Sequence, residues 1–191
     1  MTNVWFIGDT HFFHKGILEY EKEARPFKTV EEMNEVIIDR WNSVVHINDI
    51  VYHLGDFCFG RSNIIIAERL KGKKRLVMGN HDTYPTMDYL RYFEKCYGML
   101  YYKTCVLSHM PVSTGGLGSR WFLNVHGHLH SKKVLRSKFS YENKLTRECW
   151  YFEEPIEDRN YFNVSCEQNN LTPIHLDVIM ERVKELTDAN Y

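Results

Sequence analysis

The sequence predicts a layered α/β domain, and three features of its hydrophobic pattern support this fold class. Short apolar segments alternate with segments in which apolar residues recur at helical spacing. The segment 4–7 is apolar at every position, as expected for a strand that is covered on both faces. Several apolar segments end in glycine and aspartate or in similar small polar residues, where a strand gives way to a loop. We therefore expect a sheet with helices packed against it.

The elements can be assigned in chain order. Strands are expected at residues 4–7, 49–54, 75–78, 105–107, 122–125 and 161–166. Thr29 and Glu32 fit a capping box at the start of a helix whose apolar face consists of Val30, Met33, Ile37, Trp41 and Val44. A short helix is expected at 63–70, and an amphipathic helix near the end is marked by Leu176, Ile179, Val183 and Leu186.

Length and charge restrict the domain organisation and the partners. A chain of 191 residues favours a single domain over residues 1–191 with its own hydrophobic core. Residues 131–160 are polar and irregular, and we interpret them as an insertion or long excursion from that core. The formal net charge of −1 excludes a basic protein that coats nucleic acid with its whole surface, although local basic patches remain compatible with it.

The cysteines and the apolar segments indicate the compartment. The five cysteines are odd in number and widely spaced, and no CxxC pair occurs, which favours reduced thiols over a disulfide framework. No apolar segment is long enough to span a bilayer, and the sequence starts without the basic region and cleavage site of a signal peptide. We therefore expect a cytoplasmic protein without a membrane partner. The pattern does not encode its oligomeric state.

Five of the predicted strands end in clusters of aspartate, asparagine or histidine. In chain order the residues of these clusters are Asp9, His11, Asp56, Asn80, His81, Asp82, His109, His128 and His130. Loops at the carboxyl ends of strands line the functional crevice of α/β sheets, so we expect these side chains to meet.

The hexapeptide VHGHLH at 125–130 has histidines at alternating positions. On a strand, His126, His128 and His130 would project from one face and converge on one point, which suits a metal ion. A polar strand edge with hydrogen-bonded histidines explains the same pattern. The hexapeptide alone leaves both interpretations open.

Taken together, the clusters read DxH, GD, GNH, a lone histidine and GHxH, and this ordered set resembles the calcineurin-like metallophosphoesterase family. The resemblance covers roughly residues 4–130, and the later NVSCE segment is similar to related small members. It implies a four-layer αββα sandwich of two mixed sheets flanked by helices. It also implies a metal-dependent phosphoester hydrolase with two divalent metal ions.

The resemblance assigns the ligands one position at a time. Asp9, His11 and His130 would bind the first metal, Asn80, His109 and His128 the second, and Asp56 would bridge both. Oxygen and imidazole donors together suit Mn, Fe, Zn or Ni better than calcium, and we favour manganese. A metal-bridging hydroxide would then attack phosphorus in line with the leaving group. His81 would contact phosphate oxygens and protonate the leaving oxygen.

One position departs from the family pattern. Many members carry a second carboxylate three residues after the bridging one, where this chain has Phe59. Either Asp82 or a backbone carbonyl is therefore expected to orient His81, or His81 acts mainly through its charge. His14 is expected either to contact the substrate or to lie at the surface or behind the ligands. Arg61 and Arg25 are each either a contact for the substrate phosphate or a solvated arginine. His126 has no place in the ligand set, so we expect it in the core or behind the ligands.

The expected activity is that of a phosphodiesterase or phosphatase acting on a small or nucleotide-like phosphoester. An alternative is a nuclease, in which the basic segment from Lys132 to Arg147, with Phe139 and Tyr141, holds single-stranded nucleic acid. A further alternative is a non-catalytic scaffold that retains the fold and binds a protein. The complete ligand set argues against the scaffold.

Overall fold

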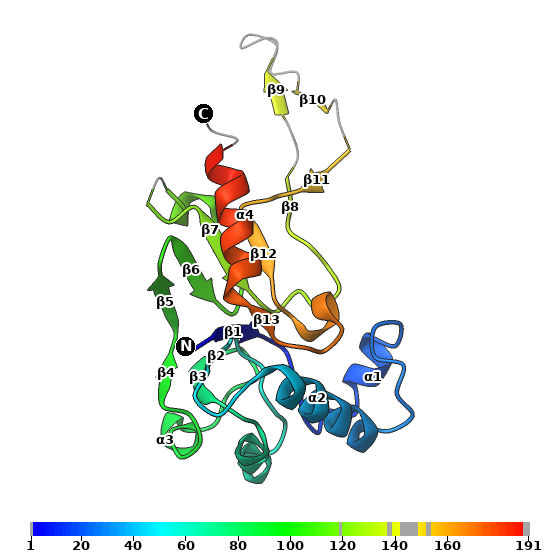
Figure 1. Ribbon diagram of the computed structural model, residues 1–191. Coiled ribbons are helices and arrows are strands. Elements are labelled where there is room, and N and C mark those ends of the chain that lie inside the picture. The colour runs from blue at the N-terminus through cyan, green and yellow to red at the C-terminus, as the bar shows by residue number, and fades with distance from the viewer. Residues whose placement is uncertain (1, 119, 137–138, 142–148, 152–153, 189–191) are drawn as a thin grey trace.

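Two mixed β-sheets form the centre of the molecule (Figure 1). The computed structural model describes residues 2–118, 120–136, 139–141, 149–151 and 154–188. The first sheet has the order β13-β1-β2-β3-β4 and contains β13 (Ile174–His175), β1 (Val4–Ile7), β2 (Ile50–His53), β3 (Lys73–Val77) and β4 (Lys95–Tyr97). The second sheet has the order β12-β7-β6-β5 and contains β12 (Tyr161–Asn163), β7 (Leu123–His126), β6 (Cys105–Ser108) and β5 (Met99–Tyr102).

The strands that precede the polar clusters all run parallel within their sheets. β1, β2, β3 and β4 are parallel neighbours, and β13 joins β1 in the antiparallel direction. In the second sheet β12, β7 and β6 are parallel, whereas β5 is antiparallel to β6. The carboxyl ends of β1, β2 and β3 therefore lie at one edge of the first sheet, and those of β6, β7 and β12 at one edge of the second.

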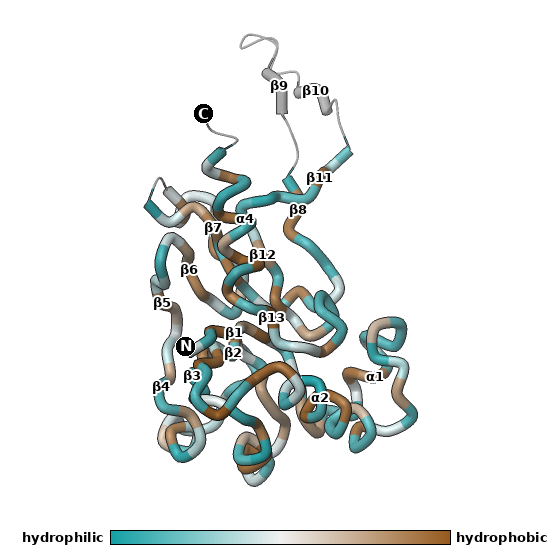
Figure 2. The backbone as a smooth tube through the Cα atoms, viewed as in Figure 1, coloured by the Kyte–Doolittle hydropathy of each residue, from teal (hydrophilic) through white to brown (hydrophobic). Residues whose placement is uncertain are grey.

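Side chains of β1 show why this strand is apolar throughout. Phe6 packs in the core between the two sheets, together with Leu107 and Val125 of the second sheet. Its neighbour Ile7 points to the opposite face and packs with Met33 of the long helix. Both faces of β1 are covered, as its sequence predicts. Figure 2 shows hydrophobic segments gathered in the strands of both sheets and hydrophilic segments in the outer loops.

Helices flank the sheets and complete the predicted layered architecture. The helical elements are α1 (Ile17–Tyr20), α2 (Val30–Val44), the 3₁₀ helix η1 (Arg61–Arg69), α3 (Thr86–Tyr89), η2 (Thr114–Gly116), η3 (Cys166–Asn169) and α4 (Leu176–Asp188). Thr29 caps α2 as predicted, because its hydroxyl accepts a 3.1 Å hydrogen bond from the Glu32 amide. On the first sheet, α2, η1 and α3 cover the outer face, and α4 packs Ile179 and Val183 into the core between the sheets.

Several elements differ from the predicted ones. The strand expected at 161–166 ends at Asn163, and Cys166 begins the 3₁₀ helix η3 instead. The helix expected at 63–70 is the 3₁₀ helix η1, which begins earlier, at Arg61. β4, β5 and β13 are absent from the sequence assignment, because each is a short edge or near-edge strand with little apolar alternation.

The segment 131–160 is less irregular than its composition predicts. β8 (Leu135–Arg136) pairs antiparallel with β11 (Ile156–Glu157), and β9 (Phe139–Tyr141) pairs with β10 (Cys149–Tyr151). Of the basic residues between Lys132 and Arg147, Lys138, Lys144 and Arg147 lie outside the described part of the chain, as do the side chains of Phe139 and Tyr141. Among the described ones, Lys133 forms an ion pair with Glu157 at 2.6 Å.

The structure also bears on the expectations about membrane spans and cysteines. No helix in the described part of the chain is both long and apolar enough to cross a membrane. Of the cysteines, Cys58, Cys96, Cys105 and Cys166 are free thiols, in agreement with the prediction of reduced cysteines.

Candidate metal centre

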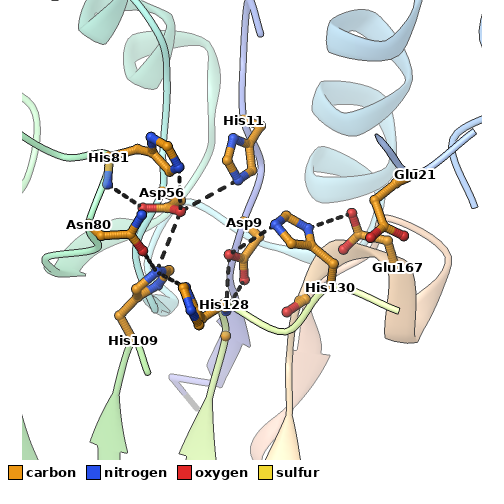
Figure 3. Close-up of polar contacts among 12 residues, drawn as sticks. Asp9, His11, Glu21, Asp56, Asn80, His81, His109, His128, His130 and Glu167 are labelled. Carbon is orange, nitrogen blue, oxygen red and sulfur yellow. Dashed lines mark hydrogen bonds and ion pairs between the residues drawn. The ribbon is translucent and has the colours of Figure 1, made fainter. Parts of the chain in front are cut away.

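Two groups of potential metal ligands lie where the strand ends of the two sheets meet (Figure 3). The first group consists of Asp9, His11 and His130, and the second of Asp56, His109 and His128. In each group one ligand atom from every residue lies within 4.8 Å of the others. The residues follow β1, β2, β6 and β7, so both sheets contribute to the centre.

Asp56 lies between the two groups. Its Oδ2 atom is 3.6 Å from Nε2 of His11 in the first group and 3.4 Å from Nε2 of His109 in the second. Its other oxygen, Oδ1, accepts a 2.9 Å hydrogen bond from the main-chain amide of His81. One carboxylate oxygen therefore faces both groups, which is the position that a bridging ligand requires.

The hydrogen bonds of His109 test whether these residues fit a cation. Its Nδ1 lies 2.8 Å from the carbonyl of Leu54, which can only accept, so Nδ1 carries a proton. Nε2 then faces Oδ1 of Asn80 at 2.8 Å and Nδ1 of His128 at 3.2 Å. Oxygen and nitrogen atoms that can bind a cation converge at this point, as they do around a metal ion.

His11 supports the same conclusion for the first group. Its Nε2 atom is buried and has no hydrogen-bond partner among the described residues. Such an unpaired buried atom costs about 1–3 kcal/mol, unless an additional partner binds it. Because this atom also points toward Asp56, a cation between them would satisfy both. The donor set therefore fits a pair of divalent ions.

Burial and mutual contacts set the charges of the ligands. Burial lowers the pKa of His11 to about 2, so this ring is neutral and can donate a lone pair. Burial opposes ionisation of Asp56, but the hydrogen bond and the charge of His109 lower its pKa to about 2. Burial raises the pKa of Asp9 to about 6. His11 and Asp56 are thus already in the deprotonated form that metal binding requires.

The backbone is unusual at five of these residues. A left-handed conformation with positive φ occurs at Asp9 (56°), His11 (48°), Asp56 (55°), His128 (68°) and His130 (51°). Residues other than glycine adopt this conformation rarely, and strained residues concentrate at functional sites. His128 and His130 therefore lie in a tight loop after β7, and they join different ligand groups instead of converging on one point as expected for a strand.

The calcineurin-like phosphoesterase family matches residues 2–176, which is most of the chain. The chain belongs to this family. The calcineurin-like phosphoesterases hydrolyse phosphoesters with the help of metal ions, and the two groups of candidate ligands agree with that chemistry.

Relatives of this calcineurin-like phosphoesterase occur in archaea, bacteria and phages. An uncharacterized protein of Methanocaldococcus jannaschii, MJ1445, is 32% identical over 97% of this chain and 93% of its own length. The Gene 66 protein of Mycobacterium phage D29 is 25% identical over 83% of this chain and 94% of its own length. A crystal structure of the protein of unknown function AQ665 from Aquifex aeolicus superimposes with a TM-score of 0.65 and 26% identity, covering 95% of this chain and 99% of that one.

Two glycines of the family motifs let the ligand loops pass close to each other. A Cβ atom on Gly127, in GHxH, would lie 2.4 Å from Oδ2 of Asp9, and one on Gly79, in GNH, would lie 2.2 Å from Oδ1 of Asp56. At Gly127 the close approach also lets the amide of His128 donate to both carboxylate oxygens of Asp9, at 3.0 and 2.9 Å. Glycine here links the GHxH loop to the DxH loop.

We expect Gly127→Ala to reduce kcat/KM and manganese affinity by about 10- to 100-fold, because the new methyl group displaces the Asp9 carboxylate. Gly98→Ala is the matched control, since nothing lies within 4 Å of a Cβ atom at that position. Manganese titration and steady-state kinetics measure both variants. Equal behaviour of the two variants would contradict this explanation of Gly127.

His81 lies beside the two groups and is accessible from outside. Its side chain is 47% exposed, and its Nε2 atom lies 4.0 Å from Oδ2 of Asp56. Ring contacts place it next to His11, at 5.6 Å between centroids, and next to Phe59, at 5.1 Å. It therefore reaches the centre without belonging to either ligand group.

Asp82 does not have the role that the sequence suggested. Its carboxylate accepts hydrogen bonds from the main-chain amides of Asp56 (2.8 Å), Phe57 (3.0 Å) and Gly79 (2.8 Å), and within the described part of the chain it forms no hydrogen bond with the His81 ring. The side chain is buried, so it is a structural acceptor for the GD and GNH loops. We correct the expectation that Asp82 orients His81.

Of the two other expected substrate contacts, His14 lies at the site and Arg61 is held elsewhere. His14 lies at the site: its Nδ1 is 3.1 Å from Nδ1 of His11, and its ring stacks on Phe59 at 3.8 Å. Arg61 is instead held in a bidentate ion pair with Asp88, at 2.7 and 3.0 Å, on η1. The aromatic ring of Phe59 thus supports His14 at the position where many family members carry a carboxylate.

Arg25 and Glu167 lie behind the centre. The position of Arg25 differs from its expected one, and Glu167 was not among the predicted site residues. Arg25 is fully buried, so it is neither solvated nor available to a substrate phosphate. Glu167, the last residue of the NVSCE segment, was assigned no role from the sequence, but it lies 3.0 Å from Nδ1 of His130. The parallel pairing of β12 with β7 explains the position of Glu167, because the chain after β12 reaches the same sheet edge as the ligand loops.

Two further histidines, His126 and His53, are core residues. His126 is buried, and its Nδ1 donates to the carbonyl of Gly127 at 2.7 Å. His53 is also buried, and its Nε2 lies 2.9 Å from the hydroxyl of Thr10. His126 therefore does not share a face with His128 and His130, and the prediction that it lies outside the ligand set agrees with its position.

Proposed function

We propose that this protein hydrolyses small phosphoesters at a dinuclear divalent-metal centre, with manganese as the favoured ion. The observation that carries the proposal is the position of Asp56 Oδ2, 3.6 Å from His11 and 3.4 Å from His109, between two groups of ligands. We assign Asp9, His11 and His130 to one ion, Asn80, His109 and His128 to the other, and Asp56 to both.

Two divalent ions in such a centre activate water and hold the phosphate oxygens for an in-line displacement at phosphorus. The protein contributes orientation and proton transfer. Asp56 is fixed through its Oδ1 by the His81 amide, and His109 is fixed through its Nδ1 by the Leu54 carbonyl. These contacts hold the ligands before substrate arrives, which avoids reorganisation during the reaction.

His81 is the proposed proton donor to the leaving oxygen. Its exposed imidazole lies beside the candidate ligands, within reach of a substrate whose phosphate occupies the centre. General acid catalysis of this kind contributes about 10²- to 10⁴-fold in rate. His14, stacked on Phe59, lies next to it and is the proposed contact for the group attached to the leaving oxygen.

We expect chelator-treated protein to be inactive and to regain turnover when Mn²⁺ is added. The measurement compares Mn²⁺, Fe²⁺, Zn²⁺ and Ni²⁺ on an aryl phosphomonoester, an aryl phosphodiester, a cyclic nucleotide and a single-stranded oligonucleotide. Full activity of the metal-free protein would refute the proposal. The relative rates on the mono- and diester identify the reaction as that of a phosphatase or a phosphodiesterase.

The same screen distinguishes the alternatives. A nuclease would prefer the oligonucleotide and lose affinity steeply as salt rises. Of the described basic residues in the segment, Lys133 is paired with Glu157 whereas Lys132 and Arg136 are exposed, so the salt dependence decides between the alternatives. A scaffold without chemistry would bind metal and show no turnover on any of the four substrates.

A further inference from the structure

Arg25 and Glu167 form an ion pair that is buried behind the candidate metal centre. Both Nε and Nη2 of Arg25 lie 2.7 Å from Oε1 of Glu167. The side chains are 0% and 1% exposed. The residues are far apart in the sequence, since Arg25 precedes α2 and Glu167 lies in η3. A buried pair of this kind is costly to desolvate, so stability alone is a weak reason for its presence.

Each partner of the pair also contacts a candidate ligand of the first metal. Oε1 of Glu167 lies 3.0 Å from Nδ1 of His130. The guanidinium of Arg25 donates to the main-chain carbonyls of Asp9 and Thr10, at 2.5 and 3.1 Å. The Asp9 carbonyl belongs to a residue with left-handed backbone, which this contact holds in place.

The segment that carries Glu167 holds His130 from a second side. The carbonyl of His130 accepts hydrogen bonds from the side-chain amides of Asn163, at 3.0 Å, and Gln168, at 2.7 Å. Both the ring and the main chain of His130 are therefore fixed by the chain between β12 and η3. The ring orientation leaves Nε2 directed toward Asp9, 4.0 Å from its Oδ1 (Figure 3).

In the second group, the buried carboxylate of Asp82 holds main-chain amides, but among the described residues no charged side chain from outside the two groups orients a histidine ring. The ring of His109 is oriented by a main-chain carbonyl, that of Leu54, at 2.8 Å. A main-chain acceptor cannot be altered by substitution of its own side chain, whereas a carboxylate can. The two halves of the centre thus differ in how their histidines are positioned.

We propose that Arg25 and Glu167 are positioning residues that act on the first metal alone, by fixing the His130 ring and the Asp9 backbone. Glu167 accepts a hydrogen bond from Nδ1–H of His130, which leaves Nε2 free to bind the ion and makes it a stronger ligand. Arg25 balances the charge of Glu167 and joins it to the DxH loop. This inference rests on the proposed two-metal centre.

The test is a manganese titration of the metal-free protein followed by calorimetry and by metal analysis after desalting. We expect Glu167→Gln to weaken the first site by about 10- to 100-fold and to leave the second site unchanged. The titration should show one binding step for each site. His109→Ala identifies the step that belongs to the second site, because it should weaken manganese binding in that step only. Glu35→Gln is the matched control, since it removes one partner of the exposed Glu35–Arg69 ion pair, at 2.6 Å.

A second variant covers the case in which Glu167→Gln fails to fold because a buried arginine is left without its partner. Arg25→Gln combined with Glu167→Gln removes both charges, and we expect the same selective weakening in a folded protein. Equal weakening of both sites, or of neither, would overturn the proposal. A wild-type protein that binds two ions and hydrolyses nothing would refute the proposed function and leave this inference intact. A wild-type protein that takes up no ion would refute both.

Discussion

Asp56→Asn is expected to lower kcat by about 10³-fold or more and to reduce the bound manganese below two ions per chain. Oδ2 of Asp56 faces both His11 and His109, so this change removes a shared anionic ligand from each half of the centre. An asparagine retains an oxygen for the hydrogen bond from the His81 amide, so the loop conformation should persist. Metal analysis and single-turnover kinetics measure the two effects separately.

The matched control for this variant is Asp39→Asn, at an exposed position of α2. It makes the same chemical change far from the candidate ligands and should have wild-type activity. If Asp56→Asn retained both the metal content and the rate of the control, Asp56 would not bridge the two groups. The assignment of the whole centre would then have to be abandoned.

His81→Ala has the second largest expected effect and a different signature. We expect kcat to fall by about 10²- to 10⁴-fold on an alkyl phosphoester while the manganese content stays unchanged. On a nitrophenyl ester the loss should be much smaller, because that leaving group departs without a proton. The ratio of the two losses measures proton donation, which a merely structural role of His81 would not alter.

His46→Ala is the control for this experiment, since His46 is exposed and lies at the turn before β2. It should match the wild-type protein on both esters. An equal loss on alkyl and nitrophenyl esters in His81→Ala would indicate that His81 binds the phosphate and donates no proton. Loss of manganese in the same variant would place His81 among the ligands.

The convergence of the candidate ligands was predictable from the sequence because it follows from a general property of parallel strands. Asp9, Asp56 and Asn80 each come directly after an apolar segment, and the ends of adjacent parallel strands lie at one edge of a sheet. His109 and His128 follow two parallel strands of the second sheet in the same way. The layered fold with two mixed sheets and flanking helices is confirmed.

The support behind the ligands was not predictable from the same pattern. Arg25 contacts Glu167, 142 residues later in the chain, and nothing in the local sequence of either residue indicates the other. Glu167 could have been found by extending the rule about strand ends to the strand at 161–163. The contacts of Asp82 with main-chain amides likewise depend on loop geometry, which hydrophobic periodicity does not encode.

The left-handed conformation of the ligand loops also lies beyond sequence pattern. His128 and His130 were expected to face one side of a strand, but β7 ends at His126. The close contact of Gly127 with Asp9 directs the chain into a loop at this point. The alternating spacing of the histidines is compatible with a strand and with a loop, so it does not distinguish the two conformations.

Because the ligands come from both sheets, the packing between the sheets affects where the ligands lie. Asp9 and Asp56 extend from the first sheet and His109 and His130 from the second, so the separation of the two sets depends on the thickness of the apolar layer between the sheets. Substitutions in the interior, such as those at Leu107 or Val125, would change the distance between the ligand atoms without touching the ligands themselves. Substitutions in the interior are therefore limited by the chemistry of the centre as well as by stability.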